Sequence, residues 1–311
     1  MRRTIRWCVG CLLAVACSVA LPRAAVPVAH PYRGITYIDR TDSSPRPLHT
    51  HIAQIDLTTP GLRFRLSPHQ GPLEVMRETT LAYLRREHAQ LAINAHFFWP
   101  WPSDTLPSSL VGIAASDGVV YSGFEHPIQR YAIVDDAPGL NIDRDNHATI
   151  VHHDSQSADA TSVLEPVRLW NTVSGSAQIV TNGVPTVPQY RDAQHPAGLL
   201  EPGGPSGGFS NAHSWYEVLV ARTAVGLSRD GRTLTLFTVD KGGGSDGMTV
   251  TEVSRLLAGD YEVWNALNLD GGGSTTMAMM DPATGAAAVV NTSSDNPSGR
   301  RVGSSLAVFA R

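Results

Sequence analysis

The most informative absence in this 311-residue chain is that of cysteine beyond its first twenty residues. All three cysteines (Cys8, Cys11 and Cys17) lie near the N-terminus, so a mature protein without that segment has no disulfide, thiolate nucleophile or cysteine metal ligand. Lysine is almost absent as well. The single one, Lys241, precedes three glycines, and we interpret it as an exposed turn residue rather than a catalyst.

The N-terminal segment has the features of an export signal. Three arginines form a basic start, and the apolar stretch from Trp7 to Ala20 is too short to span a bilayer. We predict that residues 1–25 are a signal peptide cleaved near Ala20, and that the protein is periplasmic or extracellular. Lipid attachment at Cys17 is a weaker alternative, because Ala14 stands where a leucine is expected.

The rest of the chain has no apolar stretch of transmembrane length. The formal charge is −4, and cleavage near Ala20, which removes three arginines, makes it −7. A mildly acidic exported protein argues against nucleic acid as a partner. The sequence leaves the oligomeric state open.

Short alternating segments predict an α+β fold with mixed, mostly antiparallel β-sheets, a few packing helices and a single catalytic domain. We expect residues 26–50 to be an extended entry segment and residues 51–311 to be the catalytic domain. The segment of residues 185–211 is long and rich in Pro and Gly, and we interpret it as an active-site flap.

The clearest elements are two hairpins and two helices. The hairpins are predicted from residues 51–57 with 62–66, and from residues 218–227 with 233–240. The helices are predicted over residues 80–89 and after Thr249, where Thr249-x-x-Glu252 forms a capping box.

The stretch of residues 265–277 is the centre of the functional prediction. An apolar strand ends in the carboxylate of Asp270, which three glycines and three hydroxyl residues follow. Glycines allow positive φ and bring backbone N–H groups close to an anion. A carboxylate beside such a loop suits a substrate with an electrophilic centre and a phosphate, although a turn capped by Asp270 is the simpler interpretation.

Further motifs occur in a fixed order along the chain. They are Asn94-Ala-His96-Phe-Phe, Arg222-Thr-Ala-Val-Gly226, Val239-Asp240, Gly247-Met-Thr249, Leu269-Asp-Gly-Gly-Gly-Ser-Thr275, and Val289-Val-Asn291 followed by Arg300 and Arg301. This ordered set resembles that of the phosphodiester glycosidase family over about two thirds of the chain. The departures from the family pattern, Ala95-His96 for Gly-Gly and Lys241 for Gly, bear on the shape of the sugar pocket.

The resemblance implies an enzyme that cleaves a sugar-1-phosphodiester in a glycan or envelope polysaccharide, releasing sugar and a phosphomonoester. A phosphate leaving group needs little help from a general acid. Cleavage instead needs a carboxylate to activate water or attack C1, and donors to hold the phosphate. Asp270 is our first candidate for the catalytic carboxylate and Asp240 the second, with Arg222 as a bidentate phosphate clamp.

Other residues of these motifs are candidates for substrate binding. They are Arg301 (or Arg300) as a second cation, Gly271, Gly272, Gly273, Ser274 and Thr275 as an anion site, Asn94 and Asn291 for sugar hydroxyls, His96 as a ligand contact, and Trp99 and Trp101 for stacking on the sugar.

Two other functions stay open. One is a metal-dependent phosphodiesterase that cuts P–O, with Asp240, Asp270 and His96 as ligands. The sequence requires no cofactor, the metal site is unknown, and a divalent cation has no support from these motifs. The other is a non-catalytic protein that binds glycan or cell wall, which the intact set of Asp and Arg residues argues against.

Overall fold

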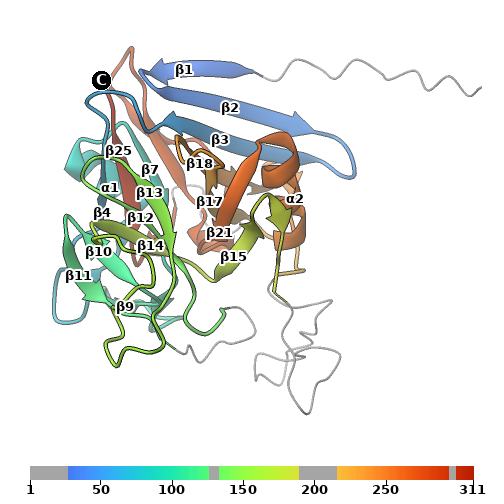
Figure 1. Ribbon diagram of the computed structural model, residues 1–311. Helices are drawn as coiled ribbons and strands as arrows, with labels where there is room; N and C mark the ends of the chain where they lie inside the picture. Colours follow the sequence, from blue (N-terminus) through green and yellow to red (C-terminus); the bar gives the residue numbers. More distant parts are fainter. Residues whose placement is uncertain (1–26, 126–132, 189–215, 294–298) are drawn as a thin grey trace, which may run out of the picture.

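The computed structural model describes residues 27–125, 133–188, 216–293 and 299–311 (Figure 1). These residues form antiparallel sheets and two α-helices. The predicted α+β fold with mostly antiparallel sheets and few helices is confirmed. Neither of the described helices is long and apolar enough to cross a membrane. The predicted signal peptide and most of the predicted flap lie outside the described residues.

The largest sheet has eight strands in the order β1-β2-β3-β18-β17-β21-β15-β16. They are β1 (Val28–Tyr32), β2 (Ile35–Asp42), β3 (Leu48–Asp56), β18 (Thr233–Val239), β17 (Arg222–Ser228), β21 (Val263–Asn268), β15 (Ala177–Thr181) and β16 (Val184–Pro185). Strands β17 and β18 pair as the predicted hairpin. The predicted entry segment, residues 26–50, is extended. It is not separate from the predicted catalytic domain, because β1, β2 and the start of β3 belong to this sheet. The predicted boundary at residue 51 falls inside β3.

A second sheet has five strands in the order β23-β22-β7-β25-β4. They are β23 (Ala287–Val289), β22 (Met277–Met280), β7 (Leu91–Asn94), β25 (Ser305–Phe309) and β4 (Arg63–Leu66). The predicted hairpin of residues 51–57 with 62–66 is wrong, since β3 pairs with β2 and β18 whereas β4 pairs with β25. Alternation identified both strands, but the partner of each is set by tertiary packing.

The remaining strands form a third five-stranded sheet and three small ones. The third sheet contains β11 (Val119–Ser122), β10 (Ala114–Ser116), β14 (Asn171–Ser174), β12 (Gly139–Ile142) and β13 (Ala148–Val151). The small sheets are β5 (Val75–Met76) with β9 (Pro107–Leu110) and β8 (Phe98–Trp99), β24 (Arg301–Val302) with β6 (Glu78–Thr79), and β19 (Lys241–Gly242) with β20 (Ser245–Asp246).

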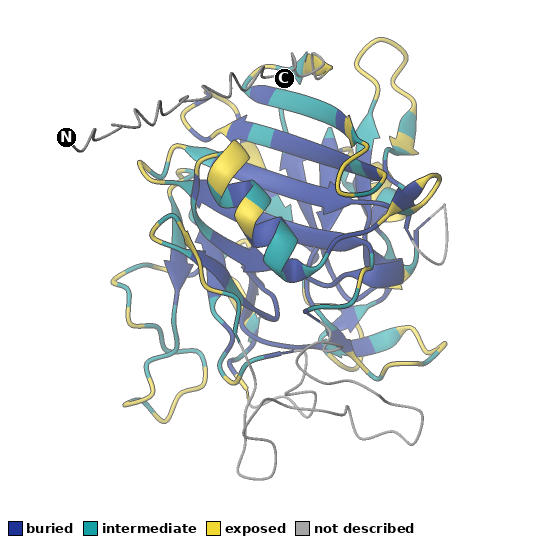
Figure 2. Ribbon diagram, turned by 90° about the vertical axis from the view of Figure 1, so that its right-hand side faces the viewer, coloured by how far each residue is buried: buried dark blue, intermediate teal, exposed yellow. Residues whose placement is uncertain are grey.

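The main hydrophobic core joins the three large sheets, with Leu236, Ile93 and Leu140 as one buried member from each. Each such side chain contributes about 1.5–3 kcal/mol through burial. Helix α1 (Thr80–Glu87) packs on the second sheet. Helix α2 (Val250–Asp260) lies across the eight-stranded sheet and keeps one face exposed (Figure 2), and its predicted capping box is present.

The backbone at Gly175 packs directly against the end of β21. A Cβ atom there would lie 1.9 Å from the backbone oxygen of Asn268, which cannot move aside. We expect Gly175→Ala to lower the free energy of unfolding by roughly 3 kcal/mol, measured by urea denaturation. The control Gly259→Ala, in α2 with open space around it, should raise it by about 0.5–1 kcal/mol. Equal stability of the two variants would contradict this account.

Candidate active site

The ends of three strands bring the predicted catalytic residues to one edge of the eight-stranded sheet. Strand β17 lies between β18 and β21 and is antiparallel to both. The ends of β18 and β21 therefore lie beside the start of β17, which places Asp240, Asp270 and Arg222 at the same edge. Two strand spacings separate β18 from β21, or roughly 10 Å.

Asn94 fixes the backbone around Asp270. Its Nδ2 donates to the backbone oxygen of Asp270 at 2.7 Å, while its Oδ1 accepts from Thr223 Oγ1 at 2.8 Å and from the Thr276 N–H at 2.9 Å. The Asp270 N–H donates to the backbone oxygen of Ala95 at 3.0 Å. Because Asn94 is fully buried and its amide bonds to protein groups, it positions Asp270 rather than contacting a sugar.

Burial makes the carboxyl of Asp270 a weaker acid than an ordinary aspartate. Only 8% of the residue is exposed, and burial raises the pKa of its carboxyl from 3.8 to about 7. The Ser274 hydroxyl, the charge of Arg300 and the Gly271 N–H act against this rise by stabilising the ionised form. A carboxyl group that titrates near neutral pH is suited to proton transfer.

The cation beside Asp270 is Arg300 and not Arg301. The Arg300 Nη1 lies 3.4 Å from Ser274 Oγ, and its guanidinium lies 4.1 Å from the centre of the Trp101 ring. Burial lowers the pKa of Arg300, and Asp270 opposes that shift. Arg301 is exposed on β24, where its backbone pairs with Thr79. Arg300 comes just before β24, and the arginine whose charge acts on Asp270 is Arg300.

Arg222 lies on the other face of the sheet, under α2. Its guanidinium donates to the backbone oxygens of Met248, at 3.0 Å, and Val218. Burial lowers its pKa to about 9, which keeps it charged at neutral pH, and Tyr216, Glu217 and Glu252 act against that shift. The structure therefore gives Arg222 a role in holding the segments on either side of α2, in place of the predicted phosphate clamp.

The glycine loop after Asp270 directs most of its amides inward. The Gly271 N–H bonds to the Asp270 carboxyl, the Gly272 N–H donates to Ala221 O at 2.7 Å, and the Ser274 N–H donates to Gly271 O at 3.2 Å. The last of these bonds, together with that from the Thr275 N–H to Gly272 O at 3.1 Å, forms a 3₁₀ turn over Gly272–Ser274. The predicted anion site made of backbone amides is therefore not present as such, and Gly273 and Thr275 belong to the same buried turn.

His96 and Asn291 also form hydrogen bonds to buried groups of the protein. The His96 Nε2 accepts from the Ser174 N–H at 2.9 Å, and its Nδ1 lies 2.8 Å from Ser304 Oγ. Burial lowers the pKa of His96 to about 4, so the ring is neutral at pH 7. Asn291 accepts from the Met277 N–H and donates to the backbone oxygen of residue 275. Among the described residues, Asp240, Asp270 and His96 do not form a group whose ligand atoms lie within 4.8 Å of one another, so the predicted metal ligand set is not assembled.

Asp240 lies between two histidines that the sequence analysis did not select. Its Oδ2 lies 3.0 Å from His49 Nδ1 and 3.3 Å from His51 Nε2, and its Oδ1 accepts from the Thr292 N–H at 2.9 Å. The pattern His49-Thr50-His51 in an alternating strand would have revealed the pair, because residues two apart share one face. Asp240 is thus oriented by its neighbours on both oxygens.

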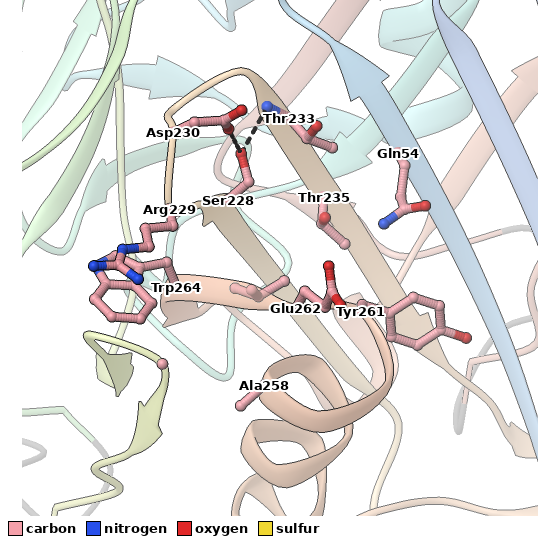
Figure 3. A pocket seen from close by; sticks show the side chains of 12 residues that line it. Gln54, Ser228, Arg229, Asp230, Thr233, Thr235, Ala258, Tyr261, Glu262 and Trp264 are labelled. Carbon is pink, nitrogen blue, oxygen red and sulfur yellow. Dashed lines mark hydrogen bonds between the residues drawn. The ribbon is translucent and has the colours of Figure 1, made fainter.

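An open hollow of about 920 Å³ lies at the other end of β17, away from Asp270. Figure 3 shows its lining, in which the Arg229 side chain lies against Trp264, with the guanidinium 4.7 Å from the ring centre. Because Ser228 ends β17 and Arg222 begins it, roughly 20 Å separates this hollow from the candidate site. It contributes none of the predicted site residues.

A buried carboxyl whose pKa is raised to about 7, held after a strand end beside an arginine, marks a candidate functional site. The chain belongs to the phosphodiester glycosidase family, which it matches over residues 87–309. That match covers more than half of the chain and includes every predicted site residue.

Solved structures support the fold. A hypothetical protein from Synechocystis superposes with a TM-score of 0.63 and 15% identity, covering 93% of this chain and 64% of that one, so this chain spans less than two thirds of that protein. The catalytic domain of the zebrafish N-acetylglucosamine-1-phosphodiester α-N-acetylglucosaminidase, auto-inhibited by its pro-peptide, gives a TM-score of 0.58 and 21% identity, covering 92% of this chain and 88% of that one. No curated protein matches the chain in sequence.

The raised pKa of Asp270 predicts a dependence of stability on pH. Between pH 4 and 7 the folded state keeps a proton on Asp270 that the unfolded state has lost, so this group lowers the free energy of unfolding as pH rises. At about 1.4 kcal/mol per pKa unit, the loss is at most ~4 kcal/mol. We expect Asp270→Asn to gain stability over the native protein between pH 4 and pH 8, measured by urea denaturation. A difference independent of pH would contradict the raised pKa.

Proposed function

We propose that this protein hydrolyses a glycosyl-1-phosphodiester by cleaving the bond between C1 of the sugar and the phosphate oxygen. The observation that carries the proposal is the pairing of Asp270, with a pKa of about 7, and Arg300 at one strand end. Membership in the phosphodiester glycosidase family supports this reaction class. So does the activity named for the zebrafish relative, which acts on an N-acetylglucosamine-1-phosphodiester.

In this proposal Asp270 is the general base. At neutral pH about half of its carboxyls are ionised, which lets it take a proton from water as the water attacks C1. The phosphomonoester leaves as a weak base and needs no strong acid. Arg300 binds the phosphate and stabilises the charge that develops on it. Asp240 is less suited to attack, because both of its oxygens face hydrogen-bond partners.

The substrate and the location of the protein belong to the same proposal. The predicted signal peptide supports export, and we propose a glycan or envelope polysaccharide as the source of the phosphodiester. Trp101 supports binding of the substrate at the edge of the site, since its ring lies over Arg300 and 37% of the residue is exposed.

Hydrolysis of α- and β-sugar-1-phosphodiesters in ¹⁸O-labelled water tests the bond that breaks. Cleavage at C1 places the label in the released sugar, and we expect this outcome, read by mass spectrometry. Asp270→Asn should lower kcat by about a thousandfold, since loss of a general base costs roughly 10²–10⁴. Label in the phosphate would overturn the glycosidase proposal in favour of P–O cleavage. Failure to hydrolyse any of these sugar-1-phosphodiesters would also count against the glycosidase proposal.

The two adjacent arginines provide a matched pair for the phosphate contact. Arg300→Ala should lower kcat/KM by about a hundredfold, because a hydrogen bond to a charged group contributes roughly 1.5–3 kcal/mol. Arg300→Lys should recover only part of the kcat/KM that Arg300→Ala loses, since lysine cannot make the two parallel hydrogen bonds of a guanidinium. Arg301→Ala, on the exposed side of β24, should stay within about twofold of the native enzyme. If Arg301→Ala lowers kcat/KM more than Arg300→Ala does in steady-state kinetics, then Arg301 and not Arg300 binds the phosphate.

A further inference from the structure

A second group of titratable side chains lies at the same edge of the eight-stranded sheet, beyond Asp240. His49 and His51 are two positions apart on β3 and share one face. Asp39 on β2 lies directly across from His51. One donor atom from each of Asp39, His49 and His51 lies within 4.8 Å of the other two. These three residues precede the part of the chain that matches the family, so the family does not imply them.

Both imidazoles of this group bond to an oxygen atom at each ring nitrogen. His49 has a carboxylate at each ring nitrogen, with Asp39 Oδ1 2.6 Å from Nε2 and Asp240 Oδ2 3.0 Å from Nδ1. His51 has Asp240 Oδ2 3.3 Å from Nε2 and the Tyr37 hydroxyl 2.7 Å from Nδ1. If an ion binds at His49 Nε2 and His51 Nδ1, the other ring nitrogen of each imidazole stays bonded to Asp240. Such a bond fixes the ring and raises its basicity towards a metal.

The group combines a buried floor with access from solvent. The side chains of His51 and Asp240 are 1% and 2% exposed, whereas those of His49 and Asp39 are 31% and 46% exposed. Thr238 lies directly across from His51 on β18, and its buried hydroxyl has no hydrogen-bond partner among the described residues. An ion can therefore enter from the side of Asp39.

We propose that Asp39, His49 and His51 bind one divalent cation, and that Asp240 orients the two imidazoles from the second shell of ligands. Two imidazoles with one carboxylate suit a cation of intermediate softness such as Zn²⁺ better than Mg²⁺ or Ca²⁺, which prefer oxygen ligands. The bound cation links β2 and β3 to the position of Asp240, next to the candidate active site. The proposal stands apart from the proposed glycosidase reaction, which uses Asp270 and Arg300.

Isothermal titration calorimetry of the full chain, without a histidine tag, tests the site with Zn²⁺ and Mg²⁺. We expect one equivalent of Zn²⁺ to bind and Mg²⁺ to bind at least tenfold more weakly. Asp39→Asn and His49→Gln, both at partly exposed positions, should each weaken Zn²⁺ binding by at least about tenfold. His152→Gln is the control, because His152 also bonds to a carboxylate, that of Glu165 at 2.7 Å, away from this group, and should leave the affinity unchanged.

Two further readouts need no turnover. Saturating Zn²⁺ should raise the Tm of the native protein and of His152→Gln, but not that of His49→Gln at the same concentration. Co²⁺ should give a ligand-field spectrum in the visible range that is lost in His49→Gln. Absence of saturable Zn²⁺ binding would overturn the proposal, as would equal affinity in all four proteins. Because none of these signals depends on substrate, they separate this inference from the fate of the glycosidase proposal.

Discussion

The side-chain amide of Asn94 holds the candidate site together. It is fully buried, and it bonds at once to Thr223 of β17, to the backbone of Asp270 and to Thr276. A buried amide left without such partners costs about 1–3 kcal/mol for each unmet group. Strand β7 and the segment after β21 must therefore meet in one arrangement, and residues 176 positions apart become neighbours. The orientation of the Asp270 carboxyl follows from that meeting.

Burial raises the pKa of Asp270, and the same burial lowers the free energy of unfolding at neutral pH. Asp270 is kept from water, and Arg300 and Ser274 recover only part of the free energy that ionisation loses there. A carboxyl group stabilised more strongly would be ionised throughout the neutral range but would be a weaker base. The fold thus keeps a destabilising group where proton transfer is useful, a common exchange between stability and activity.

The sequence predicted some members of the site and missed others for a physical reason. Asp270 was recognisable because a carboxylate that ends an apolar strand before three glycines is a local pattern. The choice between Arg300 and Arg301 depended on how the chain enters β24 and pairs with β6, and these are contacts with a distant segment that the local sequence does not show. His49 and His51 were readable as a pair on one face, but their meeting with Asp39 and Asp240 depends on the order β2-β3-β18.

By itself the sequence determined the α+β class, the β17–β18 hairpin and the capping box of α2, because propensity, alternation and capping act between residues close in the chain. It also determined the family, through the order of its motifs. Only the tertiary structure decided which strands pair, that Asn94, His96 and Arg222 bond inside the protein, and that Arg300 lies beside Asp270. These outcomes depend on the packing of segments far apart in the chain, where hydrogen-bond partners and burial arise only after the sheets have assembled.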